Sequence, residues 1–80
     1  MKLFKKESPR CPICDAEISG ALDLSHWEGH VHVIESGNAA GSYTWACNMC
    51  GPSDMCWAEN FKAAAGLGVH MMERHQLPPN

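Results

Sequence analysis

The chain has 80 residues, a formal net charge of −3 and only six basic residues. A chain of this length buries only about 60% of its unfolded surface, so its apolar core is marginal and we expect disulfides, metals or partners to support the fold. DNA-binding domains usually carry a basic excess that neutralises phosphates, and the negative charge therefore argues against a stand-alone DNA-binding domain.

Residues 1–10 form a polar tail that contains most of the basic side chains, namely Lys2, Lys5, Lys6 and Arg10. Its start looks like the charged part of a secretory signal, but Glu7 to Arg10 follow where an apolar run is required. No stretch of about 20 apolar residues that could cross a membrane is present either. We therefore expect an intracellular, cytoplasmic protein, with a nuclear location left open.

Residues 11–30 form a first unit with the spacing C-x2-C-x11-H-x3-H, supplied by Cys11, Cys14, His26 and His30. A C-x-x-C turn brings both thiolates toward one point, and histidines four residues apart lie on one face of a helix. Such donors surround Zn²⁺ tetrahedrally, at about 2.3 Å for sulfur and about 2.0–2.1 Å for nitrogen. In a reducing compartment, cysteine pairs of this kind indicate metal or redox sites before they indicate disulfides.

Residues 31–46 connect this unit to the next. The segments 31–34 and 43–46 are rich in β-prone side chains, and the turn-forming segment 36–42 lies between them. We therefore predict a β-hairpin whose second strand leads directly into Cys47.

Residues 47–75 form a second unit with the spacing C-x2-C-x19-H-x4-H, and residues 76–80 form a tail that cannot be helical beyond Pro78. The second quartet consists of Cys47, Cys50, His70 and His75.

Two helices are expected, one over residues 21–29 capped by Ser19 and one from Phe61 to His75. For the second helix, an earlier start capped by Ser53 or Asp54 is left open.

The second unit resembles the two-cysteine, two-histidine zinc finger family, in which an aromatic residue, a leucine and a histidine pair follow at fixed spacing. Here these positions are occupied by Phe61, Leu67, His70 and His75. In the first unit Ile18 takes the place of the aromatic residue, and Leu24 lies one residue closer to His26 than usual. The resemblance implies a small zinc-stabilised α+β fold with two ββα-like units, each a knuckle plus a helix, and two structural Zn²⁺ ions.

The sequence departs from that family in two places. Ten residues separate Cys50 from Phe61, where the family usually has three, and 16 residues connect His30 to Cys47. The units are therefore not spaced to read successive base triplets.

The helix positions that contact bases in this family lie seven, four and one residues before the first ligand histidine. In the first unit they are Ser19, Leu22 and Ser25, and in the second they are Ala63, Gly66 and Val69. The second set offers no side chain that can hydrogen-bond to a base edge. Its small apolar surface is instead expected either to pack the two units together or to dock a partner protein.

Other assignments of the donors are left open. The two cysteine pairs also resemble the knuckles of a zinc ribbon that share one ion, although this leaves four histidines unexplained. Cys56 is expected to be a small buried residue, with a ligand role in the second site as the alternative. His32 is expected to face solvent from a strand, and it too could serve as a ligand.

The expected function is that of a non-catalytic module that binds a partner protein. A catalytic zinc site keeps one position open for water, whereas each quartet here is complete, and no H-E-x-x-H arrangement is present. The alternatives are a DNA- or RNA-binding protein that uses the basic tail, and a zinc ribbon-like component of a transcription or translation assembly.

Overall fold

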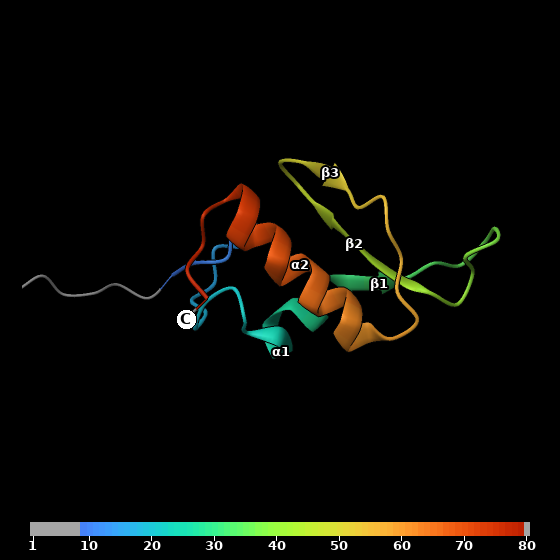
Figure 1. The fold of residues 1–80 in the computed structure, drawn as a ribbon, viewed down its shortest axis with the longest axis horizontal. Coiled ribbons are helices and arrows are strands. Elements are labelled where there is room, and N and C mark those ends of the chain that lie inside the picture. The colour runs from blue at the N-terminus through green and yellow to red at the C-terminus, as the bar shows by residue number, and fades with distance from the viewer. Residues whose placement is uncertain (1–8, 80) are drawn as a thin grey trace, which may run out of the picture.

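The computed structural model describes residues 9–79, which form a small α+β fold (Figure 1). The basic side chains of Lys2, Lys5 and Lys6 lie outside the described residues. Within residues 9–79, no helix is long and apolar enough to cross a membrane. The elements in chain order are α1 (Leu24–Trp27), the 3₁₀ helix η1 (Glu28–His30), β1 (Val31–Val33), β2 (Tyr43–Cys47), β3 (Gly51–Pro52) and α2 (Asn60–Arg74).

The three strands form one antiparallel sheet in the order β1-β2-β3. Val31 lies opposite Trp45, and Cys47 lies opposite Gly51. The hairpin predicted between residues 31–34 and 43–46 is therefore confirmed, and its second strand ends at Cys47 as expected.

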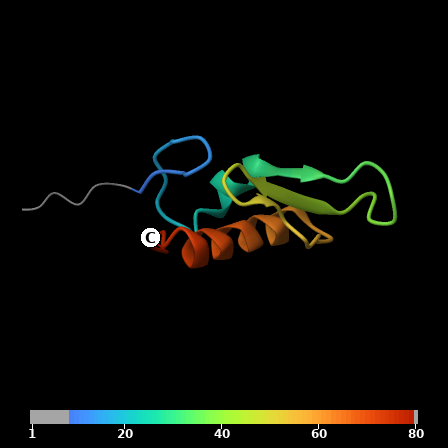
Figure 2. The same cartoon turned by 90° about the horizontal axis from the view of Figure 1, so that it is seen from above.

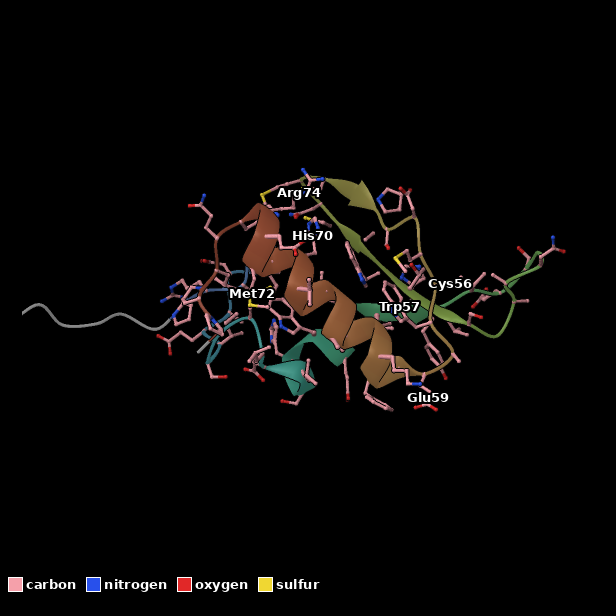
Figure 3. The ribbon with its side chains drawn as sticks, viewed as in Figure 1. Cys56, Trp57, Glu59, His70, Met72 and Arg74 are labelled. Carbon is pink, nitrogen blue, oxygen red and sulfur yellow. The ribbon has the colours of Figure 1, made fainter. Side chains whose placement is uncertain are left out.

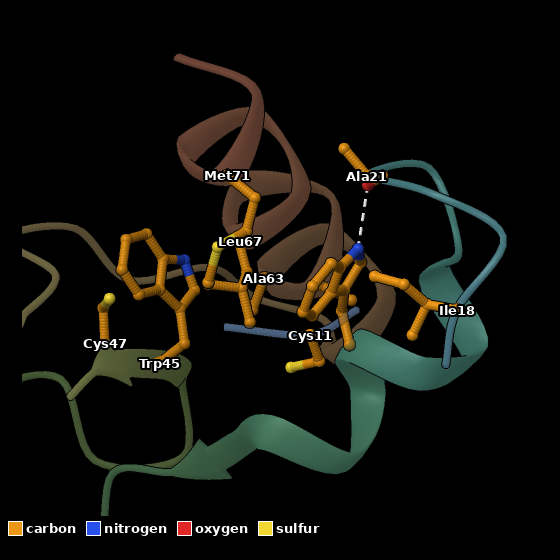
Figure 4. Close-up of a cluster of buried hydrophobic side chains, with 10 residues drawn as sticks. Cys11, Ile18, Ala21, Trp45, Cys47, Ala63, Leu67 and Met71 are labelled. Carbon is orange, nitrogen blue, oxygen red and sulfur yellow. Dashed lines mark hydrogen bonds between the residues drawn. The ribbon is translucent and has the colours of Figure 1, made fainter. Parts of the chain in front are cut away.

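Helix α2 lies along one face of the sheet and also packs against α1 and η1, so that helices and strands form two layers (Figure 2). Its buried stripe recurs at helical spacing and consists of Ala63, Ala64, Leu67, Gly68 and Met71. Both cysteine segments contribute to the same core, because Cys11 and Cys47 are almost fully buried in it (Figure 4). The complete core cluster is Cys11, Ile18, Ala21, Trp27, Trp45, Cys47, Ala63, Ala64, Leu67 and Met71.

The second unit has the order strand, strand, helix in β2, β3 and α2, but the first unit differs from the expected ββα-like arrangement. In the first unit the strand pairing is a single isolated bridge between Arg10 and Glu17, and the helix α1 has only four residues. So short a helix has too little surface to form its own core, and its buried Trp27 packs in the cluster that α2 provides. The sheet and α2 thus serve both units.

Both helices begin at positions other than the expected ones. Helix α1 is capped by Asp23, whose carboxylate accepts a hydrogen bond from the backbone N–H of His26, and not by Ser19. Helix α2 begins at Asn60, close to the expected start at Phe61. The earlier start capped by Ser53 or Asp54 is not observed, because residues 53–59 are not helical and Glu59 occupies the N-cap position of α2.

The proposed docking surface of Ala63, Gly66 and Val69 needs correction. Ala63 is fully buried, and a Cβ placed on Gly66 would collide with the indole ring of Trp57. Only Val69 is exposed, at 43% of its surface. Of the two alternatives for this part of α2, Ala63 and Gly66 therefore serve internal packing.

The cap of α1 leads to a first prediction. Replacing Asp23 by Ala removes the side-chain acceptor and should lower the free energy of unfolding by about 1 kcal/mol. Ser19→Ala is the control, because Ser19 donates its backbone N–H to Asp23 and loses no contact that involves its hydroxyl. Denaturant unfolding of the metal-loaded variants measures both effects, and an equal loss in the control would contradict the assigned cap.

Candidate metal centres

The first centre brings together Cys11, Cys14, His26 and His30, with all four donor atoms within 4.8 Å of one another. Both cysteines lie in a tight turn in which the carbonyl of Cys11 accepts the backbone N–H of Asp15 at 2.7 Å. The histidines come from α1 and the end of η1, four residues apart as the sequence predicted.

The distances within this centre match the edges of a tetrahedron around zinc. Zn–S bonds of about 2.3 Å and Zn–N bonds of about 2.0–2.1 Å place S···N pairs about 3.5–3.6 Å apart and N···N pairs about 3.3–3.4 Å apart. Cys11 Sγ lies 3.6 Å from His30 Nε2, and Cys14 Sγ lies 3.6 Å from His26 Nε2. The two Nε2 atoms are 3.3 Å apart. The donors therefore fit one shared ion better than direct hydrogen bonds to each other.

The second centre brings together Cys47, Cys50, His70 and His75 under the same 4.8 Å limit. Cys47 ends β2 and Cys50 directly precedes β3, so the knuckle is the turn of a hairpin. Gly51 has φ +94°, a conformation that side chains rarely adopt, and this allows the chain to turn back immediately after Cys50.

The histidines of the second centre come from the C-terminal end of α2, His70 from within the helix and His75 from its C-terminal cap. His75 Nε2 lies 3.5 Å from Cys47 Sγ and 3.6 Å from Cys50 Sγ, again at the S···N edge of the tetrahedron. His75 is the C-terminal cap of α2, which explains the spacing of five between the histidines, since the helix has already ended there.

His70 provides an independent indication of a bound ion. Its Nε2 atom is buried and, like the indole N–H of the neighbouring Trp45, has no hydrogen-bond partner among residues 9–79, but only the imidazole nitrogen can bind a cation. A buried polar atom without a partner costs free energy, and native structures rarely leave one unsatisfied. Coordination of a cation at the second centre would satisfy this atom, so the residues present fit a metal ion.

Burial also favours the protonation states that metal binding requires at the histidines. The pKa of His30 lies below its usual value because of burial and, to a lesser extent, the neighbouring His26. The pKa of His70 is lowered by burial first and then by the charges of His75 and Arg74. Both rings therefore tend to be neutral, and neutral imidazole is the metal-binding form.

For the thiol of Cys11, burial disfavours the deprotonated form that metal binding requires. Burial raises its pKa, so the thiolate is unfavourable there unless a cation compensates it. A divalent ion supplies that compensation, and binding would release the thiol proton. The sulfur is also placed for this role, because it accepts the backbone N–H of Ile13 at 3.4 Å.

A tryptophan packs behind the histidines of each centre. Trp27 meets the ring of His26 edge-on with 5.1 Å between ring centroids, and its indole N–H donates to the carbonyl of Ala21 at 2.8 Å. Trp45 lies 4.8 Å from the ring of His70. These buried indoles restrict the imidazole orientations, which prearranges the donors.

The remaining donors take no part in either cluster. Cys56 is exposed rather than buried, which corrects the expectation of a core residue, and it belongs to neither quartet. His32 is exposed on β1, as expected for a strand residue that faces solvent. Each cysteine pair is grouped with its own histidine pair, so the zinc-ribbon arrangement with two knuckles around one ion is not the one observed.

Neither a protein-family model, nor a characterised protein, nor a solved structure matches this chain. The assignment of the two centres therefore depends on their own geometry and donor chemistry.

Two exposed cysteines allow a matched test of the ligand assignment. Cys50→Ser removes one donor and should lose the ion of the second centre, whereas Cys56→Ser should leave the metal content unchanged. Metal analysis of both purified variants measures this. Loss of metal from the Cys56 variant would show that the assigned quartet is wrong.

Proposed function

We propose that this chain is a non-catalytic module in which two structural Zn²⁺ ions hold a surface that binds a partner protein. The observation that carries the proposal is that two sets of two sulfur and two nitrogen donors each gather within 4.8 Å, with individual S···N distances of 3.5–3.6 Å that match the edges of a tetrahedron around zinc. Tetrahedral S₂N₂ sites favour zinc among common protein metals. All five cysteines are free, which suits a reducing intracellular compartment, where such sites are retained.

The completeness of each quartet supports a structural role. Catalytic zinc normally has three protein ligands and a water in the fourth position, and here four protein donors fill the tetrahedron. A substrate would have to displace a ligand to reach either ion. The ions are therefore expected to contribute folding free energy rather than chemistry.

The distribution of charge favours a protein over a nucleic acid. Within residues 9–79 the only basic side chains of the lysine and arginine type are Arg10, Lys62 and Arg74, and Arg10 is paired with Glu17 at 3.6 Å. Phosphate-driven binding requires clustered cations. Ala63, which occupies a base-reading position of the finger family, lies on the buried face of α2 and is unavailable to DNA.

A cleft beside the second centre is the best candidate for the docking position. It has a volume of about 400 Å³, is lined in part by the ligands Cys50 and His70 of that centre, and lies between the β2–β3 segment and the last turns of α2, where Figure 3 labels His70 and Arg74. Met55, 63% exposed, contributes an apolar wall, and Arg74 forms no ion pair within the described residues. These features suit a peptide segment with an apolar side chain beside an acidic one.

The metal part of the proposal predicts two Zn²⁺ ions per chain. Native mass spectrometry should show a mass increase that corresponds to two ions. X-ray absorption should show an average of two sulfur ligands at about 2.3 Å and two nitrogen ligands at about 2.0–2.1 Å. A single ion surrounded by four sulfurs would support the ribbon arrangement instead.

The partner part predicts that charge reversal in the cleft abolishes protein capture. Arg74→Glu places an acid where the partner's acid would lie, whereas Lys62→Glu makes the same change in charge at another position of α2. Zinc-loaded wild type should retain a nuclease-resistant protein partner that the Arg74 variant loses and the Lys62 variant keeps. If nuclease treatment abolishes capture, the nucleic-acid alternative is favoured. If the Arg74→Glu variant still captures the partner, this cleft is excluded as the docking position.

A further inference from the structure

We propose that the two metal centres bind their ions cooperatively, so that the chain passes between a metal-free form and a two-ion form with little of any one-ion form. This inference rests on the proposed zinc binding and adds an energetic coupling between the sites. Three structural connections between the centres support it.

Helix α2 provides the first connection. It carries His70 of the second centre, and it packs against α1 and η1, which carry the histidines of the first centre. Trp27 lies between those histidines in sequence and is fully buried in the core that α2 lines. The first centre can therefore take its observed geometry only when α2 is in place.

A close backbone contact strengthens this connection. A Cβ placed on Gly68 of α2 would collide with the carbonyl oxygen of Ala21. The same carbonyl accepts the indole N–H of Trp27 at 2.8 Å (Figure 4). Gly68 is thus the position at which α2 approaches the segment that leads into the first pair of histidines.

The C-terminal tail provides the second connection. It follows His75, the last ligand of the second centre, and its carbonyls at Pro78 and Pro79 accept the backbone N–H groups of Ala21 and Leu22 at 2.8 and 3.0 Å. The residues just beyond one centre therefore hold the residues just before the histidines of the other.

The sheet provides the third connection. His30 ends η1, and β1 begins at the next residue, where Val31 lies opposite Trp45 on β2. Strand β2 ends at Cys47, and Trp45 packs against the ring of His70. The start of β1 and the end of β2 lie at the same end of this hairpin, so an ion at either centre would fix that end.

These connections imply coupling because both centres require α2 and the sheet to be ordered. The free energy needed for that ordering is therefore spent only once, when the first ion binds. The first ion to bind must supply the free energy that orders both elements. The second ion then meets donors that are already arranged, so its apparent affinity is higher. By linkage, each centre must raise the affinity of the other by the same factor.

A Zn²⁺ titration of the whole chain followed by native mass spectrometry tests this directly. Equal, independent centres would give a one-ion form of about half the chains at half-loading, and cooperativity should reduce it well below that. A one-ion form at or above half would overturn the coupling. A chain that never binds a second ion would contradict the two-centre function itself.

Two alanine variants test the structural route of the coupling. Gly68→Ala should separate α2 from Ala21 and increase the one-ion form, although alanine by itself favours a helix. Gly29→Ala is the control, because its added Cβ meets nothing within 4 Å, and its titration should match wild type. A wild-type titration for Gly68→Ala would show that this contact does not carry the coupling.

If Gly68→Ala fails to fold even with zinc, a variant that lacks one ligand tests the coupling between the centres instead. His26→Ala removes a donor of the first centre only, and it should weaken zinc binding at the second centre by about tenfold or more. Competition with a chromophoric chelator measures that affinity. An unchanged affinity at the second centre would overturn the proposal.

Discussion

Two sets of sulfur and nitrogen donors converge beside the same buried core, and the proposed coordination of a metal ion by each set is the interaction on which the fold would depend. Among residues 9–79, only ten form the buried cluster, and two of them, Cys11 and Cys47, are themselves donors of the two centres. Their thiols occupy core positions as a hydrophobe would, but each also belongs to a quartet with tetrahedral spacing. An ion at each point would therefore join the metal bonds to the apolar packing, which alone is marginal for so short a chain.

The same arrangement explains why the aromatic residues are placed where they are. Trp27 and Trp45 each contact a histidine of one centre, and both are buried in the cluster that α2 covers. A substitution that repacks the core would therefore shift a histidine ring. A change in metal coordination would in turn alter the packing of the core. If the proposed function holds, metal occupancy would also control the cleft beside Arg74, because Cys50 and His70 of the second centre line it.

The sequence predicts the donors well because each cysteine pair and each histidine pair has the short internal spacing typical of zinc ligands. The intervals within each quartet, and the turn-rich segment between two β-prone runs, were sufficient to predict both clusters and the hairpin that includes Trp45. The role of α2 is not predictable in this way, because its close approach to Ala21 joins segments far apart in the chain and has no spacing that signals it. Ala63 and Gly66 therefore looked like a docking surface when they are internal packing positions.

The central claim is that metal coordination supplies the free energy that the small core lacks. Structural zinc contributes about 10–16 kcal/mol in isolated finger peptides, which is comparable to the whole stability of an ordinary domain. The most direct test is the amide NMR spectrum of the chain before and after removal of metal by a chelator under reducing conditions. We predict that the dispersed resonances collapse to those of an unfolded chain and return when zinc is restored. A dispersed spectrum that persists without metal would contradict the account.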